Sequence, residues 1–367
     1  MIKNIGIFLG HPAHFHNFKH VAENLKRDGY NVFFSIKEKD ILENLCKEAG
    51  YEYYKLREGR GQSKLALVKS VLGMEYKMLK FIHKNKVDLL IGSTLSFAAA
   101  KLANIPVLVL CEDDAYIAPH FARIVYPFAT AIFSPISCDN GRWEYKSVKY
   151  PGFQKLTTLH PNQFDARKDV VRKNGINPDE PYFLMRFAKL NAHHDAGVSG
   201  ISTEIAQRLI DILSSHGKIY ITSERPLEPQ FEQYRLHINP LDIHHIMAFA
   251  TLYIGDSQSM ANEAAMLGVP SLRFNDFVGA KRIGVMEELE HVYGLTYGIS
   301  SHEPERLYAK VEELLAMPNL REEFQKRRQK MLSEKIDVTA FLTWFIENYP
   351  QSAEEARKAD AEFWKKF

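Results

Sequence analysis

The chain has 367 residues, a formal net charge of +2 and a charged fraction of 25%. Single cores rarely grow beyond about 250–300 residues, so this length favours two domains. The nearly balanced charge gives no reason to expect a nucleic-acid partner. The three cysteines, Cys46, Cys111 and Cys138, lack metal-ligand spacing. An odd, sparse set of cysteines is typical of a reducing compartment, so we expect a cytoplasmic protein.

The segment Ile2–Leu9 is a short apolar run followed by Gly-His-Pro. It is too short to span a membrane and lacks a small-residue cleavage site, so we expect a first strand rather than a signal peptide. No later stretch approaches the length of about twenty apolar residues that a membrane-spanning helix needs. We therefore expect at most contact with a membrane surface.

Short apolar runs alternate with amphipathic stretches through the first half of the chain. After Ile2–Leu9, the pattern predicts, in order, a helix over Phe15–Asp28, a strand over Tyr30–Ile36, a helix over Ile41–Ala49, a strand over Tyr51–Leu56, a helix over Lys64–Lys84, a strand over Val87–Ile91, a helix over Ser96–Ala103, and strands over Val107–Leu110 and Ala131–Phe133. Such alternation is typical of a parallel, doubly wound sheet.

The stretch Tyr150–Phe164 changes to Pro, Gly and scattered aromatics, which favours an inter-domain connection. A second series then follows, with strands over Tyr182–Arg186, Lys218–Ser223, Leu252–Ile254 and Val269–Arg273, and helices over Glu204–His216, Ile243–Ala250, Met260–Leu267, Glu303–Leu315, Leu320–Lys335, Val338–Glu347 and Glu354–Phe367. We predict an α/β protein with two Rossmann-like, doubly wound domains facing a cleft. The predicted divisions are residues 1–155, residues 156–345, and a terminal helical segment over 346–367 that can return to the first domain.

Ligands of such sheets bind outside the carboxyl ends of the strands, so the loops after the strands are the first places to search. In the second half, Leu252–Ile254 is followed by a Gly255–Ser259 turn and a helix. A helix start offers free backbone N–H groups and a positive dipole end, which favour a phosphate. Glu263, one turn into the helix, can reach a ribose hydroxyl. The alternative is an ordinary turn in which a serine caps the helix.

Cationic side chains follow two other strands of the second half. Arg186 ends the strand Tyr182–Arg186, and Ser223-Glu224-Arg225 follows the strand that begins at Lys218. Because a guanidinium can contact phosphate through two hydrogen bonds, both arginines are candidate phosphate ligands.

Three histidines, His11, His14 and His16, follow Gly10 directly after the first strand. Histidine titrates near neutrality and suits proton transfer. The spacing H-x-x-H-x-H also suggests a metal, but no carboxylate or cysteine lies nearby in sequence, and we predict no metal site. We expect one of the three histidines to act as a base or as a hydrogen-bond donor to the substrate. The alternative is that all three cap and solvate the first helix.

The densest acidic cluster of the first half, Glu112-Asp113-Asp114, follows the strand Val107–Leu110. A carboxylate beside other carboxylates can have a raised pKa and serve as a general base. The alternative is that these acids cap helices. Separately, Lys64–Lys84 has the composition of a basic amphipathic helix that can lie on anionic lipid, although an ordinary core-facing helix explains it as well and is preferred here.

Four motifs together resemble the GT-B glycosyltransferases and the related UDP-N-acetylglucosamine 2-epimerases. They are GHPAH-x-H-x-F (Gly10–Phe18), Y-x-G-(F/Y) (Tyr150–Phe153), L-x-P-x-x-F (Leu159–Phe164) and D-S-x-x-M-x-x-E-A-A-x-L-G-x-P (Asp256–Pro270). They are most similar to those of a prokaryotic GT-B-like family of unknown function that is often assigned to surface-polysaccharide synthesis.

The resemblance implies a nucleotide-sugar enzyme whose second domain holds the donor and whose first domain holds the acceptor and the base. The candidate catalytic residues are His14, His16, Glu112 and Asp113. The candidate donor-binding residues are Gly10, His11, Arg186, Ser223, Glu224, Arg225, Asp256, Ser257, Gln258, Ser259, Met260 and Glu263. The donor is a substrate, and no resident cofactor or metal is expected, since helix N-termini and arginines can stabilise a leaving diphosphate.

The resemblance to the epimerases is incomplete. Glu112 stands where those enzymes keep a catalytic glutamate, but their Gly-Asp-Thr segment is Gly92-Ser93-Thr94 here, and their His-Arg-Arg-Glu-Asn segment is missing. The leading expectation is a cytoplasmic glycosyltransferase, with peripheral contact to the inner membrane as an option, that moves a sugar from a UDP-linked or similar donor to a polysaccharide or lipid-linked acceptor. The alternatives are a nucleotide-sugar epimerase or hydrolase, and a non-catalytic sugar-nucleotide binding protein.

Overall fold

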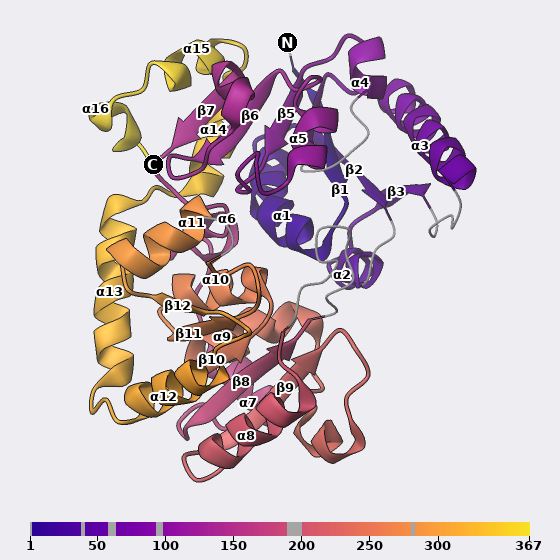
Figure 1. The fold of residues 1–367 in the computed structure, drawn as a ribbon. Coiled ribbons are helices and arrows are strands. Elements are labelled where there is room, and N and C mark those ends of the chain that lie inside the picture. The colour runs from indigo at the N-terminus through magenta and orange to yellow at the C-terminus, as the bar shows by residue number, and fades with distance from the viewer. Residues whose placement is uncertain (1, 38–40, 58–63, 93–97, 189–199, 280–282) are drawn as a thin grey trace. The chain divides into compact units, whose positions relative to one another are not determined.

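The computed structural model describes residues 2–37, 41–57, 64–92, 98–188, 200–279 and 283–367. The chain divides into two compact units (Figure 1). The first unit comprises Met1–Gln163 and Lys335–Phe367, and the second comprises Phe164–Glu334. Both units are parallel α/β domains, and each is described separately below.

Among its described residues, the first unit is built on a seven-stranded parallel sheet with the order β3-β2-β1-β4-β5-β6-β7. The order reverses between β1 and β4, which makes the carboxyl ends of these two strands the topological switch point. The strands are β1 (Asn4–Leu9), β2 (Asn31–Lys37), β3 (Tyr53–Arg57), β4 (Leu89–Gly92), β5 (Val107–Leu110), β6 (Ala131–Pro135) and β7 (Ser147–Tyr150).

Helices cover both faces of this sheet (Figure 1). One face packs against the buried side chains of α3, α4 and α5, and the other packs against α1 and its neighbours α2, α6 and α14. The helices are α1 (Pro12–Arg27), α2 (Leu42–Glu48), α3 (Lys64–Lys84), α4 (Ala98–Leu102), α5 (Pro119–Val125), the 3-10 helix η1 (Gly141–Lys146), α6 (Leu156–Leu159), α14 (Val338–Glu347), α15 (Gln351–Arg357) and α16 (Ala361–Trp364).

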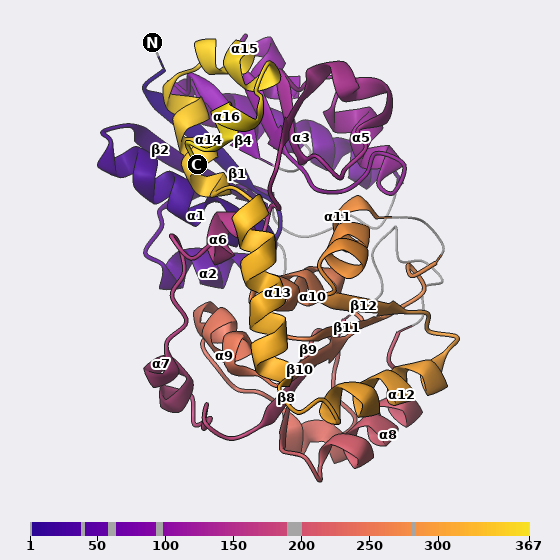
Figure 2. The same cartoon turned by 90° about the vertical axis from the view of Figure 1, so that its left-hand side faces the viewer.

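The segment Lys335–Phe367 belongs to the first unit because of its aromatic packing. Phe341 on α14 is fully buried, and its ring lies 5.9 Å from that of Tyr150, 5.1 Å from Trp364 and 5.4 Å from Phe367. Aromatic side chains bury large areas, about 150–250 Å² each. Figure 2 shows α14 beside α1, against which it packs. The predicted divisions at 155/156 and 345/346 therefore differ from the structure, which places α6 and all of α14 in the first unit.

The second unit contains, in the part of the chain that the structure describes, a five-stranded parallel sheet with the order β12-β11-β10-β8-β9. The strands are β8 (Tyr182–Phe187), β9 (Lys218–Ser223), β10 (Leu252–Gly255), β11 (Ser271–Phe274) and β12 (Thr296–Ile299). Because β8 lies between β9 and β10, the order reverses at β8 and β10, and their carboxyl ends form the switch point of this sheet.

The helices of the second unit pack in two groups, α8 with α12 and α7 with α9 and α10. They are α7 (Lys168–Lys173), α8 (Thr203–Leu213), η2 (Pro229–Tyr234), η3 (Pro240–Asp242), α9 (Ile243–Phe249), α10 (Gln258–Met266), α11 (Gly284–Glu287), the π-helix η4 (Glu288–Val292), α12 (Pro304–Leu315) and α13 (Leu320–Glu334). Figure 2 shows α13 beside α10, where Gln325 and Arg328 donate hydrogen bonds to the carbonyls of Leu267 and Met266 at 2.9 and 2.8 Å. These bonds satisfy carbonyls at the end of α10.

None of the helices within the described ranges is both long and apolar enough to cross a membrane.

Candidate functional site

The predicted phosphate corner is a strand–turn–helix unit in the structure. Ser257 is the N-cap of α10, and its hydroxyl accepts a hydrogen bond from the Met260 N–H at 3.5 Å. The first helical bond joins the Ala261 N–H to the Ser257 carbonyl at 3.1 Å. The backbone N–H groups of Gln258 and Ser259 come before it and meet no acceptor among the described residues. They remain available to an anion.

Two arginines flank this corner. Gly255, the last residue of β10, pairs in register with Arg186 on β8 and with Arg273 on β11. The Nε atoms of both arginines are buried and have no hydrogen-bond acceptor among the described residues. Since a folded protein usually satisfies buried donors, two unsatisfied guanidinium N–H groups beside a helix N-terminus make this edge a candidate anion site.

Arg186 and Arg225 differ in how firmly they are held. The Nη2 atom of Arg186 donates to Glu224, whose side chain is 45% exposed. A surface pair of this kind contributes little stability and can rearrange around a ligand. Arg225 instead donates to Glu228 at 3.2 Å and to the Ile201 carbonyl at 3.0 Å. Arg225 is therefore held by the protein itself.

Ser223 forms a tight turn with Arg225. Its hydroxyl donates to the Arg225 carbonyl at 2.7 Å and accepts the Arg225 N–H at 3.2 Å. Ser223 thus shapes the loop after β9.

Asp256 is buried and hydrogen-bonds to the backbone around this corner. Its carboxylate accepts hydrogen bonds from the Ala188 N–H at 2.6 Å and the Ile201 N–H at 3.4 Å, and its carbonyl accepts one from the Asn275 amide at 3.0 Å. Burial raises the pKa of Asp256 to about 6, against the lowering effect of these N–H donors. The sequence predicts a donor-binding Asp256, but the structure turns its carboxylate toward backbone groups.

Glu263 lies on the buried side of α10. It is 8% exposed, and its Oε2 is 3.4 Å from the His244 Nε2 on α9. Glu263, which the sequence predicts to contact a ribose, thus lies beside a protein group in this structure. Met260 is half-buried and Ser259 is exposed at the rim of the corner.

In the first unit, the helix predicted over Phe15–Asp28 begins earlier, at Pro12, so α1 includes His14 as well as His16. Proline is favoured at the first helical position, where its missing N–H costs nothing. His11 is the N-cap, and its Nδ1 accepts the Ala13 N–H at 3.2 Å. The His14 Nδ1 accepts the N–H of the buried Gly10 at 3.2 Å. A neutral ring that accepts at Nδ1 carries its proton on Nε2, so Nε2–H is the donor of a neutral His14.

His16 lies two residues further along α1 and packs against Phe15. Its ring lies edge-on to Phe15 at 5.3 Å, and its carbonyl accepts a hydrogen bond from the Thr158 hydroxyl. These contacts tie His16 to the helix packing beside α6.

The three acids after β5 have three different environments. Asp114 is buried and accepts the Asp139 N–H at 2.6 Å, so it braces the loop. Asp113 is exposed. Glu112 is half-buried, with its Oε1 3.7 Å from the Nζ of Lys155, whose side chain is only 6% exposed. Lys155 thus places a buried cation beside the carboxylate that the sequence predicts as a general base.

Glu112 and His14 follow β5 and β1, which end at the same edge of one parallel sheet. Residues 93–97, which follow the intervening strand β4, lie outside the described residues, and with them Ser93 and Thr94 of the comparison with the epimerases.

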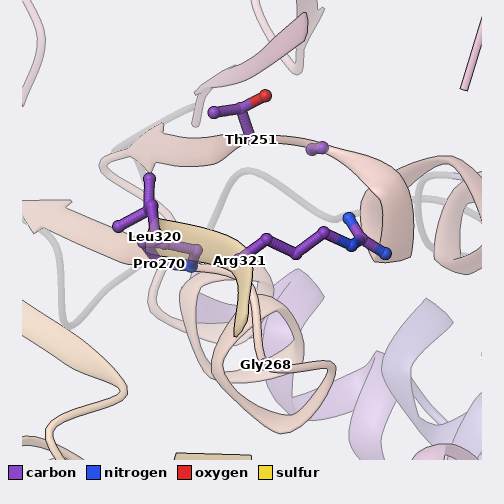
Figure 3. A pocket seen from close by; sticks show the side chains of 6 residues that line it. Thr251, Gly268, Pro270, Leu320 and Arg321 are labelled. Atoms are coloured by element: carbon purple, nitrogen blue, oxygen red, sulfur yellow. The ribbon is translucent and has the colours of Figure 1, made fainter. Parts of the chain in front are cut away.

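A small pocket lies at the opposite edge of the second sheet (Figure 3). Thr251 and Pro270, which precede β10 and β11, line it together with Leu320 and Arg321. Its volume of about 70 Å³ is room for about two water molecules. It is too small for a nucleotide, and it lies at the amino ends of the strands, away from the corner.

Within the described ranges, no three His, Cys, Asp or Glu side chains gather so that they could hold a metal ion.

The two parallel sheets with their helices define an α/β protein, and the solved structures similar to it have the GT-B fold. The chain belongs to the family described as "Protein of unknown function (DUF354)", whose model matches residues 3–283. The predicted fold class and the family resemblance are thereby confirmed. No curated protein matches the chain.

Solved structures resemble the chain over nearly its whole length. A UDP-GlcNAc 2-epimerase from Neisseria meningitidis, bound to UDP-GlcNAc, is 13% identical, with 94% of this chain and 99% of that chain covered and a TM-score of 0.64. MnaA from S. aureus, in a structure with UDP, is 14% identical, with 97% and 98% covered and a TM-score of 0.66. A calicheamicin glycosyltransferase is 14% identical, with 95% and 100% covered and a TM-score of 0.58. At these identities the likeness concerns the fold.

Two residues of these sites escape the sequence-based search. Arg273 lies within the strand β11, and Lys155 lies in the stretch read as a linker. The sequence does offer a signal for each: Arg273 is a charged residue within a strand, and Lys155 lies beside Gly and aromatic residues. A charged residue that is buried at such a position needs a partner.

Proposed function

We propose that the protein is a glycosyltransferase that moves a sugar from a nucleoside diphosphate donor, UDP-linked by the family resemblance, to a saccharide or lipid-linked acceptor. The observation that carries the proposal is the corner at the switch point of the second sheet. There the open N–H groups of Gln258 and Ser259 lie between two arginines whose Nε–H groups lack acceptors among the described residues. Such a corner suits the two phosphates of a nucleotide sugar.

In the proposed reaction, an acceptor hydroxyl oxygen bonds to the anomeric carbon while the bond from that carbon to the diphosphate oxygen breaks. Glu112, in the first unit, is the proposed base and takes the hydroxyl proton. The N-terminus of α10 and Arg186 stabilise the negative charge that grows on the leaving diphosphate.

Donor binding is tested by thermal unfolding with UDP, GDP, ADP and their sugars, with and without Mg²⁺. A ligand present at a hundred times its Kd, and bound by the folded state alone, adds about 2.7 kcal/mol to the free energy of unfolding. We expect such a shift with at least one nucleotide. Absence of any shift across the panel would overturn the donor-site assignment.

A catalytic function is distinguished from simple binding by Glu112→Gln. We expect this variant to lose sugar transfer while it keeps the affinity for the nucleotide, because Glu112 lies in the first unit. Unchanged turnover would remove Glu112 from the mechanism.

A nucleotide-sugar epimerase or hydrolase is the second candidate, since UDP-GlcNAc 2-epimerases share the fold. Incubation with a UDP-sugar and no acceptor separates these activities. UDP release indicates hydrolysis, a new sugar stereoisomer in the NMR spectrum indicates epimerisation, and a requirement for added acceptor indicates transfer.

Contact with a lipid surface is a separate part of the proposal. On α3 and α4, which pack together, Leu72, Tyr76 and Leu102 are 64%, 59% and 78% exposed, and Lys101 is exposed beside Leu102. Co-sedimentation with anionic vesicles, lost in Leu72→Glu, would support a location at the inner membrane. Recovery in the supernatant at low salt would instead support the core-facing interpretation of α3 alone.

A further inference from the structure

Arg273 occupies an unusual position for a charged residue. It lies in the strand β11, is 4% exposed, and its Nη1 donates to the Gln258 Oε1 at 2.9 Å. Burial lowers the pKa of Arg273, while the charges of Glu290 and Glu287 raise it. The strand therefore carries a buried guanidinium to the first residue of α10.

The space around this guanidinium is closely defined. A Cβ atom added at Gly298 would lie 2.9 Å from the Arg273 Nη2 and 3.1 Å from the Glu290 Oε2. The same Glu290 oxygen accepts the Gly298 N–H at 3.0 Å. The missing side chain of Gly298 on β12 thus leaves room for the guanidinium, and the Glu290 carboxylate on η4 lies beside the same glycine.

The contact with Arg273 determines the orientation of the Gln258 amide. A guanidinium has only donors, so the amide atom that faces it must be the oxygen. The Nε2 group, with two N–H donors, then faces away from Arg273. Gln258 is the first residue of α10, so this amide belongs to the same helix start as the open backbone N–H groups of Gln258 and Ser259.

We propose that Arg273 is a positioning residue that fixes the Gln258 amide as a further hydrogen-bond donor to the diphosphate. The inference rests on the proposed function, because it assigns a donor to the same corner. It also gives the corner a specificity. The two backbone N–H groups, the Gln258 amide and the arginine Nε–H groups are all donors, so the ligand must offer acceptor oxygens, and a negative charge at position 258 opposes its binding. A separate observation supports the proposal: the buried Nε–H of Arg273 has no hydrogen-bond acceptor among the described residues.

The first experiment uses Gln258→Glu and measures the Kd of UDP and of inorganic pyrophosphate by titration calorimetry. Glutamate has the same shape and keeps an oxygen toward Arg273, so we expect an unchanged or higher melting temperature without ligand. The donor is replaced by a charged acceptor, so we expect at least tenfold weaker binding of both probes. Gln258→Met, which removes the donor without adding charge, is expected to weaken binding less.

The second experiment separates positioning from a general structural effect. Arg273→Met is made in the wild-type and in the Gln258→Met background. If Arg273 acts through Gln258, its replacement weakens UDP binding clearly more in the first background than in the second, where only its own Nε–H and charge are lost. Equal losses in both backgrounds would overturn the positioning assignment. Arg273→Lys, which keeps one donor for the amide oxygen, is expected to restore part of the affinity.

The outcomes distinguish this inference from the proposed function. If the wild-type protein binds neither UDP nor any other nucleoside diphosphate, both fail. If the wild type binds UDP and Gln258→Glu binds it equally well, the proposed function stands and the assignment of Gln258 and Arg273 is overturned. If Arg273→Met does not fold, the UDP affinity of Gln258→Glu still tests the proposal.

Discussion

At the scale of single residues, Asp256 combines burial with two backbone N–H donors. Its pKa lies at about 6 in the folded protein instead of 3.8, chiefly because burial disfavours the charged form. A carboxyl whose pKa is raised by folding binds its proton more tightly in the folded state, so stability falls as the pH rises between these two values.

We therefore predict that the stability of the wild type relative to Asp256→Asn falls by about 2 kcal/mol between pH 4 and pH 7. Urea unfolding of both proteins across this range provides the measurement. Because all other titrating groups are shared, the difference isolates Asp256. A difference that is flat with pH, or rises, would contradict the buried-carboxyl interpretation.

Lys155 and Glu112 form the second residue-scale pair, with 3.7 Å between Nζ and Oε1. Removing one partner of a buried pair leaves a charge without its counter-ion and costs about 3–5 kcal/mol. We predict that Lys155→Met destabilises the first unit toward the lower end of that range, since Glu112 is only partly buried. We also predict that adding Glu112→Gln restores much of the loss. Additive losses in the double variant would show that the two groups do not interact.

The sequence reveals where to look for the site but not which way its side chains face. Arg186 lies near the carboxyl end of β8, Arg225 follows β9, and the start of α10 follows β10, as the pattern predicts. The sequence cannot show that Asp256 and Glu263 contact protein groups. The hydrogen bond between Asp256 and Ala188, and the contact between Glu263 and His244, depend on the packing of distant segments.

At the scale of elements, predictability follows the strength of the apolar pattern. The predicted bounds Lys64–Lys84, Val107–Leu110, Lys218–Ser223 and Val338–Glu347 agree with the structure. The four-residue strands β7 and β12, Ser-Val-Lys-Tyr and Thr-Tyr-Gly-Ile, lack the continuous apolar run of β5, which has the same length, and so give no clear signal. The predicted last helix, Glu354–Phe367, is wrong: Asp360 caps a separate helix, α16, so the chain bends between two short helices.

The β10–α10 element itself depends on a glycine. A Cβ atom at Gly255 would lie 2.5 Å from the Tyr253 hydroxyl and 2.9 Å from the Arg186 Cβ. We predict that Gly255→Ala costs about 1–3 kcal/mol of stability through overpacking and weakens UDP binding by displacing Arg186. Chemical unfolding and calorimetry measure the two effects.

The matched control for this variant is Gly73→Ala on the exposed side of α3, where the added Cβ meets no atom within 4 Å. There alanine is expected to stabilise the helix by about 0.5–1 kcal/mol and leave UDP binding unchanged. Equal behaviour of the two variants would mean that Gly255 has no special packing constraint.

At the scale of the whole molecule, the position of a segment in the sequence does not determine which of the two units it joins. Apolar periodicity predicts α14 correctly, yet the sequence assigns most of it to the second domain because it follows the second sheet. The structure assigns it to the first unit through the aromatic contacts of Phe341 and through Asp337, which accepts a hydrogen bond from the Gln163 amide at 2.8 Å. A pattern in one segment does not reveal which distant surface covers it.

This difference gives a prediction about which unit loses stability. Phe341 is fully buried, and truncation of a buried phenylalanine costs about 3–5 kcal/mol. We predict that Phe341→Ala lowers the hydrogen-exchange protection of β1, β4, β5 and β6 while the protection of β8, β10 and β11 changes little. Leu272→Ala on β11, also fully buried, is the matched control and should show the opposite distribution. If Phe341→Ala instead exposes the second sheet, the assignment of α14 to the first unit is wrong, and the division read from the sequence is the better one.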